Sequence, residues 1–336
     1  MVIRKNNKFV HISVVEHLPQ GLSVLLDNGK RGIVGLHEIS WDTDNSTKWK
    51  KDYPIGWDGF ALSIPTKKGD VPEFSLRLTE KDPREQIQLL QKAGMEMLQI
   101  ARRSKDDFWL TVLTIATANF GFGFNRALLF LTKDNREILY GRTGVGTNNI
   151  SQAFFDWERE ERKKSDLNSF LKNLEAGRIR LTPFHEMVCG MVLSLDEFGN
   201  KMRKTLETSR IVKIKSGDLL KHVPNSIIEK FELSDCAVLS IGTGNYISGL
   251  VIVDNKHNNK PLSDRSLGSL QSLLANAGLV WEILRQRERS EDLLDANLEI
   301  LSSASRQSLK GTLDRICRTA HLISNADWTI IHPFRA

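Results

Sequence analysis

The chain has 336 residues, of which 40% are hydrophobic and 26% are charged, so it can form two or three globular domains with separate cores. It has no apolar run long enough to cross a bilayer and no signal-peptide pattern at its start, so we expect a cytoplasmic protein. The three cysteines, Cys189, Cys236 and Cys317, lack metal-ligand spacing and their odd number argues against a disulfide framework. The net charge of +6 is too mild to indicate nucleic acid by itself.

The first 80 residues predict a small closed β-barrel. Short β-like segments separated by turn signals occupy 9–12, 22–26, 32–36, 60–64 and 74–78. Asn28-Gly29, between the second and third segments, predicts a tight hairpin because this pair accepts the positive φ angles of a primed turn.

The amino-acid sequence of this expected barrel resembles that of the S1 domain, an OB-fold common in RNA-binding proteins. The resemblance is carried by GLSVLLDNGKRGIVGLHEISW at 21–41 and by YPIG at 53–56. It implies RNA as a possible partner, although the positions 19–22 lack the aromatic residues that RNA-binding S1 domains usually display there. Candidates for base stacking and phosphate contacts are Trp41, Lys48, Trp49, Lys50, Lys51 and Trp57. Alternatively, the tryptophans pack the loop between the third and fourth strands onto the barrel.

Charge does not favour the RNA interpretation. Residues 1–80 hold eleven Lys/Arg and ten Asp/Glu, so no basic field is evident. An RNA-binding protein in which the rest of the chain only dimerises is therefore the second candidate function.

Two helices are expected after the barrel. Asp82 is a suitable N-cap, Pro83 suits the first helical position, and Glu85 completes the pattern, with apolar residues at helical spacing up to 101. A charged break at 102–107 separates this helix from a second one at 108–119.

The segment 124–146, FNRALLFLTKDNREILYGRTGVG, predicts a β-hairpin, because two short apolar runs flank a polar turn. Further strands are expected at 209–214, 236–241 and 246–255, the last two joined by a hairpin turn at 242–245. Ser263 or Asp264 would cap the following helix.

These segments resemble the GAF domains of bacterial signalling proteins. The 124–146 hairpin resembles their first two strands, and 249–284, GLVIVDNKHNNKPLSDRSLGSLQSLLANAGLVWEIL, resembles their last strand and helix. The resemblance spans 86–288 and implies a sensor domain at 82–290 that binds a small molecule or a partner. Its insertion at about 148–208 is either a lid over the pocket or a segment without a role in binding. Within the insertion we expect a solvated charged helix face at 156–164 and short helices at 166–176 and 187–195.

The C-terminal part is expected to repeat this pattern. The helix would continue through 290–305 with leucines spaced for a helical partner. The segments 313–322 and 326–333 mirror 112–118 and 126–131, so 291–336 is interpreted as a connecting helix and the start of a second GAF domain.

Motifs of chemical interest have plainer explanations. The sequence GRTGVG at 141–146 lacks the ending of a phosphate loop and is interpreted as a strand-end turn. His185, Glu186 and Cys189 form HExxC, either a metal site with one ligand replaced or a coincidence on a helix face. We expect neither bound metal nor an enzyme. No cysteine is followed by histidine, as in bilin-binding GAF domains, so covalent bilin is not expected and the ligand is unknown.

The sequence therefore predicts a multidomain fold: an all-β S1/OB-like barrel followed by an α/β (α+β) GAF domain with an antiparallel sheet and flanking long helices. The predicted function is sensory regulation, with helices 84–101 and 264–305 pairing in a homodimer and signalling to output domains outside this chain. The candidate ligand-pocket residues are Phe130, Tyr140, Arg142, Cys236, Ser240 and Tyr246.

Overall fold

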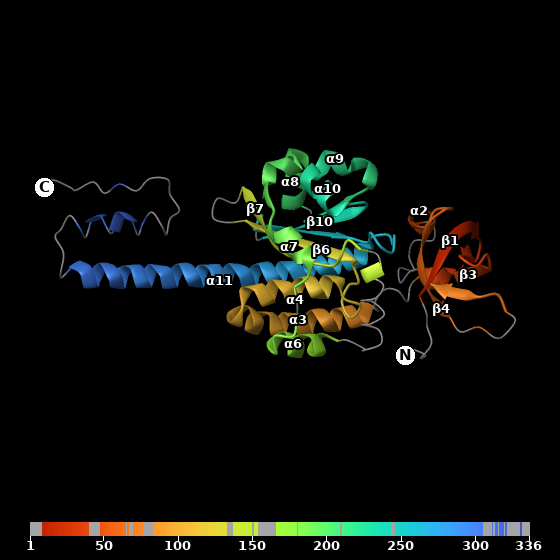
Figure 1. The fold of residues 1–336 in the computed structure, drawn as a ribbon, viewed down its shortest axis with the longest axis horizontal. Coiled ribbons are helices and arrows are strands. Elements are labelled where there is room, and N and C mark those ends of the chain that lie inside the picture. Colours follow the sequence, from red (N-terminus) through yellow and green to blue (C-terminus); the bar gives the residue numbers. More distant parts are fainter. Residues whose placement is uncertain are drawn as a thin grey trace.

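The computed structural model describes residues 9–39, 48–64, 66, 70–76, 83–132, 137–149, 151–153, 166–179, 181–208, 210–242 and 246–304, with isolated residues between 311 and 330. Within these residues a β-barrel at the N-terminal end lies beside a larger α/β domain, from which one long helix extends (Figure 1).

The predicted five-stranded barrel is confirmed. Its strands are β1 (Phe9–Leu18), β2 (Gly21–Leu26), β3 (Arg31–Gly35), β4 (Asp58–Ile64) and β5 (Glu73–Ser75). They close in the order β1-β2-β3-β5-β4, with β3 and β5 parallel and the other pairs antiparallel. Two short helices, α1 (Leu36–Ile39) and α2 (Lys48–Asp52), connect β3 to β4. The barrel interior is filled by Ile12, Val14, Leu22, Val24, Val34, Ala61 and Phe74.

The expected hairpin between β2 and β3 forms, but it is not the primed turn that Asn28-Gly29 predicts, because only the glycine of this pair has a positive φ and the Gly29 amide donates to the Leu26 carbonyl. Gly29 has φ +76°, and the Lys30 amide donates a hydrogen bond of 3.0 Å to Asn28 Oδ1. The asparagine side chain and the glycine backbone together fix the register of β2 against β3.

The larger domain is built on a six-stranded sheet. Its order is β8 (Val192–Ser194), β7 (Ile138–Val145), β6 (Arg126–Thr132), β11 (Gly249–Asp254), β10 (Cys236–Ile241) and β9 (Ile211–Ile214). Each neighbouring pair is antiparallel. Every residue of β6, β10 and β11 is buried, which requires a helical layer on both faces of the sheet.

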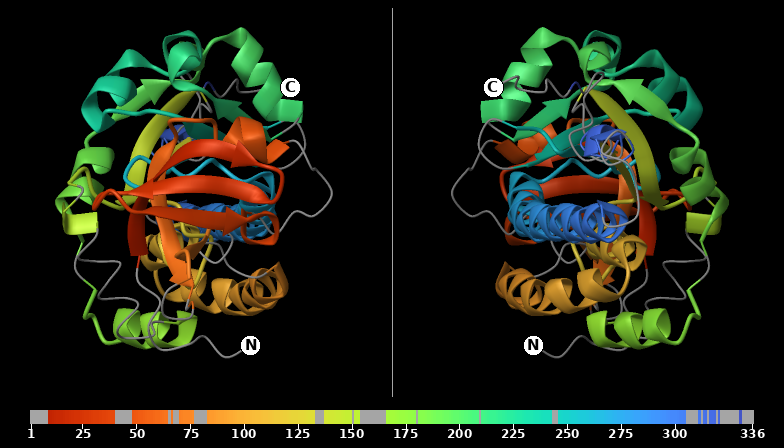
Figure 2. Two further views of the ribbon diagram at one scale, coloured as in Figure 1. Left: turned by 90° about the vertical axis from the view of Figure 1, so that its right-hand side faces the viewer. Right: turned by 90° about the vertical axis from the view of Figure 1, so that its left-hand side faces the viewer.

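One face carries the long-helix layer, which consists of α3 (Pro83–Arg103), α4 (Lys105–Thr117) and α11 (Asp264–Ala304). End-on views show this layer on one side of the sheet (Figure 2). Ser104 separates α3 from α4, because its extended backbone breaks the helix and its hydroxyl accepts a 3.1 Å hydrogen bond from the Asp107 amide. The predicted break at 102–107 is therefore shorter than expected, because 102–103 end α3 and 105–107 form the first turn of α4. The short helix α6 (Leu167–Glu175) contacts α4, and the expected helix at 166–176 is confirmed.

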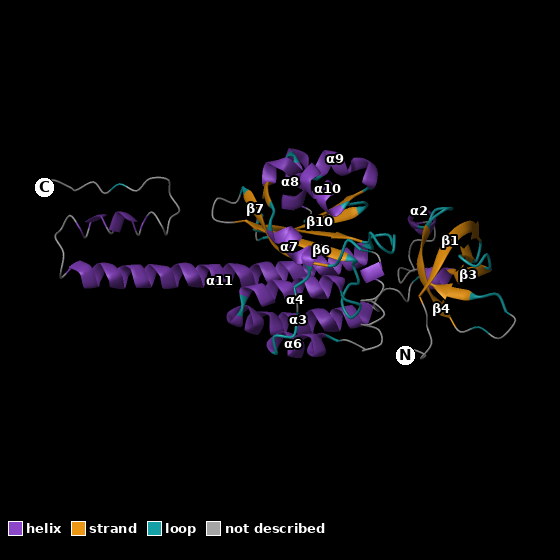
Figure 3. Cartoon of the chain, viewed as in Figure 1, coloured by secondary structure: helices purple, strands orange, loops and turns teal. Residues whose placement is uncertain are grey.

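The opposite face carries the small-helix layer, formed by α7 (Pro183–Cys189), α8 (Asn200–Thr208), α9 (Leu219–His222) and α10 (Asn225–Phe231), with two 3-10 turns (Figure 3). The helix expected at 187–195 is wrong at its C-terminal end. Helix α7 ends at Cys189, and Val192–Ser194 pair with β7 as the edge strand β8. Residue alternation explains the strand, because Leu193 is buried while the β-branched Val192 is 61% exposed.

Helix α11 runs 41 residues without a break and continues past the sheet (Figure 1). Ser263 caps its start, accepting a 3.4 Å hydrogen bond from the Ser266 amide at its hydroxyl. None of the described helices combines the length and hydropathy that a bilayer crossing needs. The second domain expected after α11 falls almost wholly outside the described residues, as does the charged segment 156–164.

Helix α7 lies unusually close to β7 because β7 has glycines beneath it. A Cβ atom at Gly141 would lie 1.8 Å from the Val188 carbonyl oxygen, and one at Gly144 would lie 2.6 Å from Val188 Cγ2. Neither position has room for a side chain. The 141–146 segment expected to be a strand-end turn is therefore mainly the C-terminal part of β7, and its glycines seat a helix.

We predict that Gly141→Ala destabilises the α/β domain by about 1–3 kcal/mol, because the new methyl group overlaps a backbone oxygen. Gly94→Ala, on an exposed part of α3 with no atom near the added Cβ, is the control and should stabilise the helix by about 0.5–1 kcal/mol. Urea unfolding of both full-length variants measures the difference. Equal midpoints would contradict the close seating of α7.

Candidate functional site

Three of the six candidate ligand residues lie together under the small-helix layer. Phe130 on β6 and Cys236 on β10 belong to the apolar cluster that fills the space between the sheet and this layer. Ser240 lies four residues after Cys236, on the same face of β10. Its hydroxyl donates a 2.9 Å hydrogen bond to the Leu206 carbonyl of α8. All three are fully buried. In this conformation the three side chains form part of the core between the sheet and the small-helix layer.

Burial also determines the chemistry of Cys236. Desolvation raises the pKa of its thiol far above the usual value, and the negative charges of Asp254 and Asp235 raise it further. Cys236 is therefore a neutral, apolar part of the core.

The other three candidates lie elsewhere. Arg142 forms an ion pair with Asp106, at 2.5 Å, and thereby joins β7 to the start of α4. Tyr140 is half-buried on β7, opposite Leu131, and Tyr246 is 61% exposed before β11. The structure thus distributes the six residues over both sheet faces and a loop.

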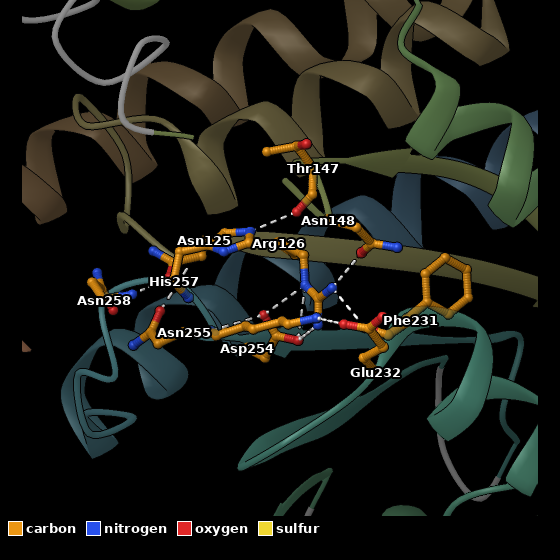
Figure 4. Close-up of polar contacts among 11 residues, drawn as sticks. Asn125, Arg126, Thr147, Asn148, Phe231, Glu232, Asp254, Asn255, His257 and Asn258 are labelled. Carbon is orange, nitrogen blue, oxygen red and sulfur yellow. Dashed lines mark hydrogen bonds and ion pairs between the residues drawn. The ribbon is translucent and has the colours of Figure 1, made fainter. Parts of the chain in front are cut away.

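A buried ion pair joins the first strand of the sheet, β6, to the last, β11 (Figure 4). The Arg126 Nε atom lies 3.0 and 3.1 Å from the two Asp254 oxygens, and a guanidinium nitrogen makes a further contact. Both side chains have no solvent exposure. The same guanidinium donates a hydrogen bond of 2.7 Å to the Phe231 carbonyl at the end of α10 and one of 2.5 Å to Asn148 Oδ1. Its donors are satisfied as a buried charge requires.

The pair continues into a network that holds the loop between β11 and α11 (Figure 4). Asn125 Oδ1 accepts hydrogen bonds from the amides of His257, at 2.8 Å, and Asn258, at 3.0 Å. The Asn255 side-chain amide donates a hydrogen bond of 3.0 Å to the Lys260 carbonyl. His257 is buried, which lowers its imidazole pKa, and its Nε2 lies 2.6 Å from the Thr147 carbonyl.

This loop is also where the barrel touches the α/β domain. Trp57 Nε1 donates a 2.9 Å hydrogen bond to the Asn259 carbonyl, and Asn259 has φ +50°. These contacts give the loop a structural role between the sheet and α11. Sequence reasoning missed Arg126, although a charged residue inside an apolar strand indicates a buried partner. Thr147 and Asn148 gave no sequence signal.

The HExxC motif lies on α7, where its histidine and cysteine contact each other. Cys189 Sγ lies 3.3 Å from His185 Nε2, and His185 Nδ1 lies 2.9 Å from Thr143 Oγ1 on β7. Among the described residues, no group of three or more His, Cys, Asp or Glu is arranged to hold a metal ion.

The candidate RNA-contacting tryptophans pack onto the barrel where the structure describes them. Trp49 is half-buried against the barrel core and meets the His17 ring edge-on at 5.2 Å, while Trp57 meets Tyr53 edge-on at 4.9 Å. Lys50 lies over the Trp49 ring and Lys51 is exposed. Trp41 and the Lys48 side chain lie outside the described residues. The packing alternative thus accounts for both described rings.

A charged cluster on the barrel was not expected from the sequence. The His11 ring lies between two carboxylates, with Nδ1 2.7 Å from Asp27 and Nε2 2.9 Å from Asp58. Partial burial by itself lowers the His11 pKa, but the hydrogen bond to Asp27 and the charges of Asp58 and Asp27 outweigh it and raise the pKa above its usual value.

A second unexpected feature is an open cavity of about 400 Å³ between α3, α4 and α6. The Arg103–Glu175 ion pair lies at its wall. Its lining residues are Glu96, Gln99, Ile100, Arg103, Asp107, Leu171, Leu174 and Glu175.

No family model and no curated protein sequence matches the chain. Among solved structures, it is similar to the GAF domain of a Coxiella burnetii phosphoenolpyruvate-protein phosphotransferase, with 9% identity over 62% of this chain and 99% of that one (TM-score 0.42). It is similar to the GAF domain of an Acinetobacter phosphoenolpyruvate-protein phosphotransferase, with 16% identity over 60% and 96% (TM-score 0.39).

A third similarity is to the Stigmatella aurantiaca phytochrome photosensory core module, with 10% identity over 81% of this chain and 52% of that one (TM-score 0.43). At these identities and TM-scores, interpretation depends on this chain's own strand order and motifs.

We predict that Asp254→Asn destabilises the α/β domain by about 3–5 kcal/mol, because it leaves the Arg126 guanidinium buried without a counter-charge. The matched control is Glu232→Gln, which removes a nearby exposed carboxylate paired with Lys256 and should leave the unfolding midpoint nearly unchanged, because solvent screens this pair. Urea unfolding of both variants compares the costs. Similar losses would show that the buried pair is not a structural determinant.

We predict that His11 titrates above its usual value and that the barrel loses this source of stability as the pH rises. The folded pKa is raised, so the stabilisation is fully present below the unfolded pKa of about 6.5 and disappears through the higher folded value. NMR titration of the His11 ring measures this pKa. Asp27→Asn should lower it, whereas Glu16→Gln, on the same strand, should leave it unchanged.

Proposed function

We propose that this chain is a sensory regulator whose α/β domain is a GAF domain. The observation that carries the proposal is the strand order β8-β7-β6-β11-β10-β9, with long helices on one face and short helices on the other. The antiparallel sheet and flanking long helices are what the resemblance to GAF domains implies, and the two segments that carry it, 124–146 and 249–284, pair as β6, β7 and β11. Regulation here is by binding, without catalysis.

The N-terminal unit is assigned, as part of this proposal, to the S1/OB class. Support comes from its closed order β1-β2-β3-β5-β4, its parallel β3–β5 pair and its helical connection between β3 and β4. The contact of Trp57 with the loop before α11 suits a role for the barrel in regulation, since it links the barrel to the start of the long helix.

Ligand binding under the small-helix layer would require that layer to move. Phe130, Cys236 and Ser240 are fully buried, so a small molecule at this face must displace core side chains or find a conformation in which α7–α10 have shifted. A ligand that prefers the shifted arrangement would change its population, which is what a sensor needs.

The signal would leave through the long-helix layer of a homodimer. Helices α3 and α11 lie side by side. Both expose large apolar side chains. On the distal half of α11, Leu294 is 62% and Leu298 64% exposed, spaced as on one helix face. On α3, Ile87 and Met95 are similarly exposed. Pairing with a second copy would cover these residues.

We predict that the full chain is a dimer and that Leu294→Glu combined with Leu298→Glu makes it monomeric, because charges would be buried between the helices. Leu220→Glu, which places the same charge at a 77% exposed leucine of the small-helix layer, is the control and should leave the dimer intact. Light scattering coupled to gel filtration measures the mass. A wild-type monomer would overturn the helix-pairing part of the proposal.

Native mass spectrometry of the full chain purified from cells tests the binding part. A retained small molecule that is lost on denaturation supports the sensor proposal and identifies the ligand class. A chain without added mass, with no shift in melting temperature across nucleotides, amino acids and carboxylic acids, would count against small-molecule sensing.

A further inference from the structure

Three side chains from α7 and β7 are arranged as a nucleophile, a base and an orienting group. The sulfur of Cys189 lies 3.3 Å from His185 Nε2 and 3.1 Å from the Arg142 carbonyl oxygen. The other ring nitrogen of His185 lies 2.9 Å from the Thr143 hydroxyl. A cysteine and histidine in contact, with the histidine held by a third group, is the geometry of an activated thiol.

The fold builds this arrangement from β7 as well as from α7. His185 and Cys189 are four residues apart and so share one face of α7. The glycines of β7 let this helix approach until its side chains reach the strand. The register of β6 against β7 also shifts at Arg142, because Thr143 pairs with Leu129 while Gly141 pairs with Phe130. This bulge leaves the Arg142 carbonyl available to Cys189.

The Cys189 thiol donates to the Arg142 carbonyl, and rotation about the Cβ–Sγ bond turns its proton toward His185 Nε2. When Thr143 Oγ1 accepts a hydrogen bond from His185 Nδ1–H, the unprotonated Nε2 faces the Cys189 thiol. Thr143 is buried, so it fixes the ring without competition from water. In the protonated imidazole both nitrogens donate, one to the threonine and one to the sulfur.

Cys189 needs such a base. Partial burial raises the pKa of its thiol, the charges of Asp106 and Glu186 raise it further, and the Arg142 guanidinium opposes them. The free thiolate is therefore scarce, and the sulfur becomes nucleophilic when His185 takes its proton. Cys189 is exposed, whereas Cys236 is sealed in the core.

We propose that Cys189 is a site of reversible oxidation by hydroperoxides, with His185 as the general base and Thr143 as its positioning residue. The Cys189 S–H proton passes to His185, and the sulfur attacks one oxygen of hydrogen peroxide. The O–O bond breaks and an S–O bond forms. The departing hydroxide takes the proton from the imidazolium, which gives a sulfenic acid and water. The thiol is oxidised by two electrons and the peroxide is reduced.

The Cys189 sulfenic acid can be reduced to the thiol again. Because Cys236 is buried, it cannot form a disulfide with Cys189 in the folded domain, and we assign the reduction of the sulfenic acid to a small thiol acting through a mixed disulfide. The added oxygen would lie where α7 meets β7, at the edge of the small-helix layer. Oxidation thus acts on this layer independently of any small-molecule ligand.

The test uses the full chain with Cys317→Ser, so that Cys189 is the reactive thiol of the folded protein. Hydrogen peroxide is added, dimedone traps the sulfenic acid, and mass spectrometry of the peptide that contains Cys189 gives the rate at neutral pH, separately from Cys236, which urea exposes. Cys189 should react faster in the folded chain than in the urea-unfolded chain. His185→Gln should slow the folded reaction by about tenfold or more, and Thr143→Val should slow it to a smaller extent.

The matched control is His222→Gln on α9, which removes an imidazole in the same layer and should leave the rate unchanged. Circular dichroism confirms that each variant is folded, and the comparison with urea needs no substitution in α7 or β7. A folded chain that reacts no faster than the unfolded one, or an unchanged rate in folded His185→Gln, overturns the proposal.

Discussion

The structure of the α/β domain depends on one buried ion pair. Arg126 begins the first strand of the sheet, Asp254 ends the last, and their adjacent positions in register join the two ends of the domain sequence. A buried guanidinium without this carboxylate would be very costly, so the pair restricts how β6 and β11 can align. The same arginine holds the end of α10 through the Phe231 carbonyl. One side chain therefore connects the sheet with the small-helix layer.

From this pair, hydrogen bonds lead to the start of α11 and to the barrel. Asn125, beside Arg126, holds the amides of His257 and Asn258, and the next residue, Asn259, accepts the bond from Trp57. A rearrangement at the Arg126–Asp254 end of the sheet would thus change the contacts of both α11 and the N-terminal barrel. This continuity provides a physical route for the proposed regulation, whose direction depends on which arrangement a ligand prefers.

The two faces of the sheet have different properties. The long-helix layer is extensive and continues into α11, which exposes leucines away from the domain. The small-helix layer consists of short helices over an apolar cluster. Its closest attachment to the sheet is at Gly141, where backbone meets backbone. The proposed oxidation site on α7 lies at this attachment, where a single added oxygen can alter packing.

The sequence by itself determined the barrel strands, the long helices and the central strands of the sheet, but not the edge strand β8 or the short helices α8–α10. Alternation, caps and turns predicted the barrel strands, the break at Ser104, the hairpin of β6 and β7, and the long helix after Ser263, because these features depend on neighbouring residues. Only the tertiary structure decided which distant residues meet. Arg126 and Asp254 are 128 residues apart, and Thr143 and His185 are 42 apart. The candidate pocket residues were dispersed because one bulge and the sheet register decide which face each side chain takes. Those long-range pairings leave no local pattern in the sequence.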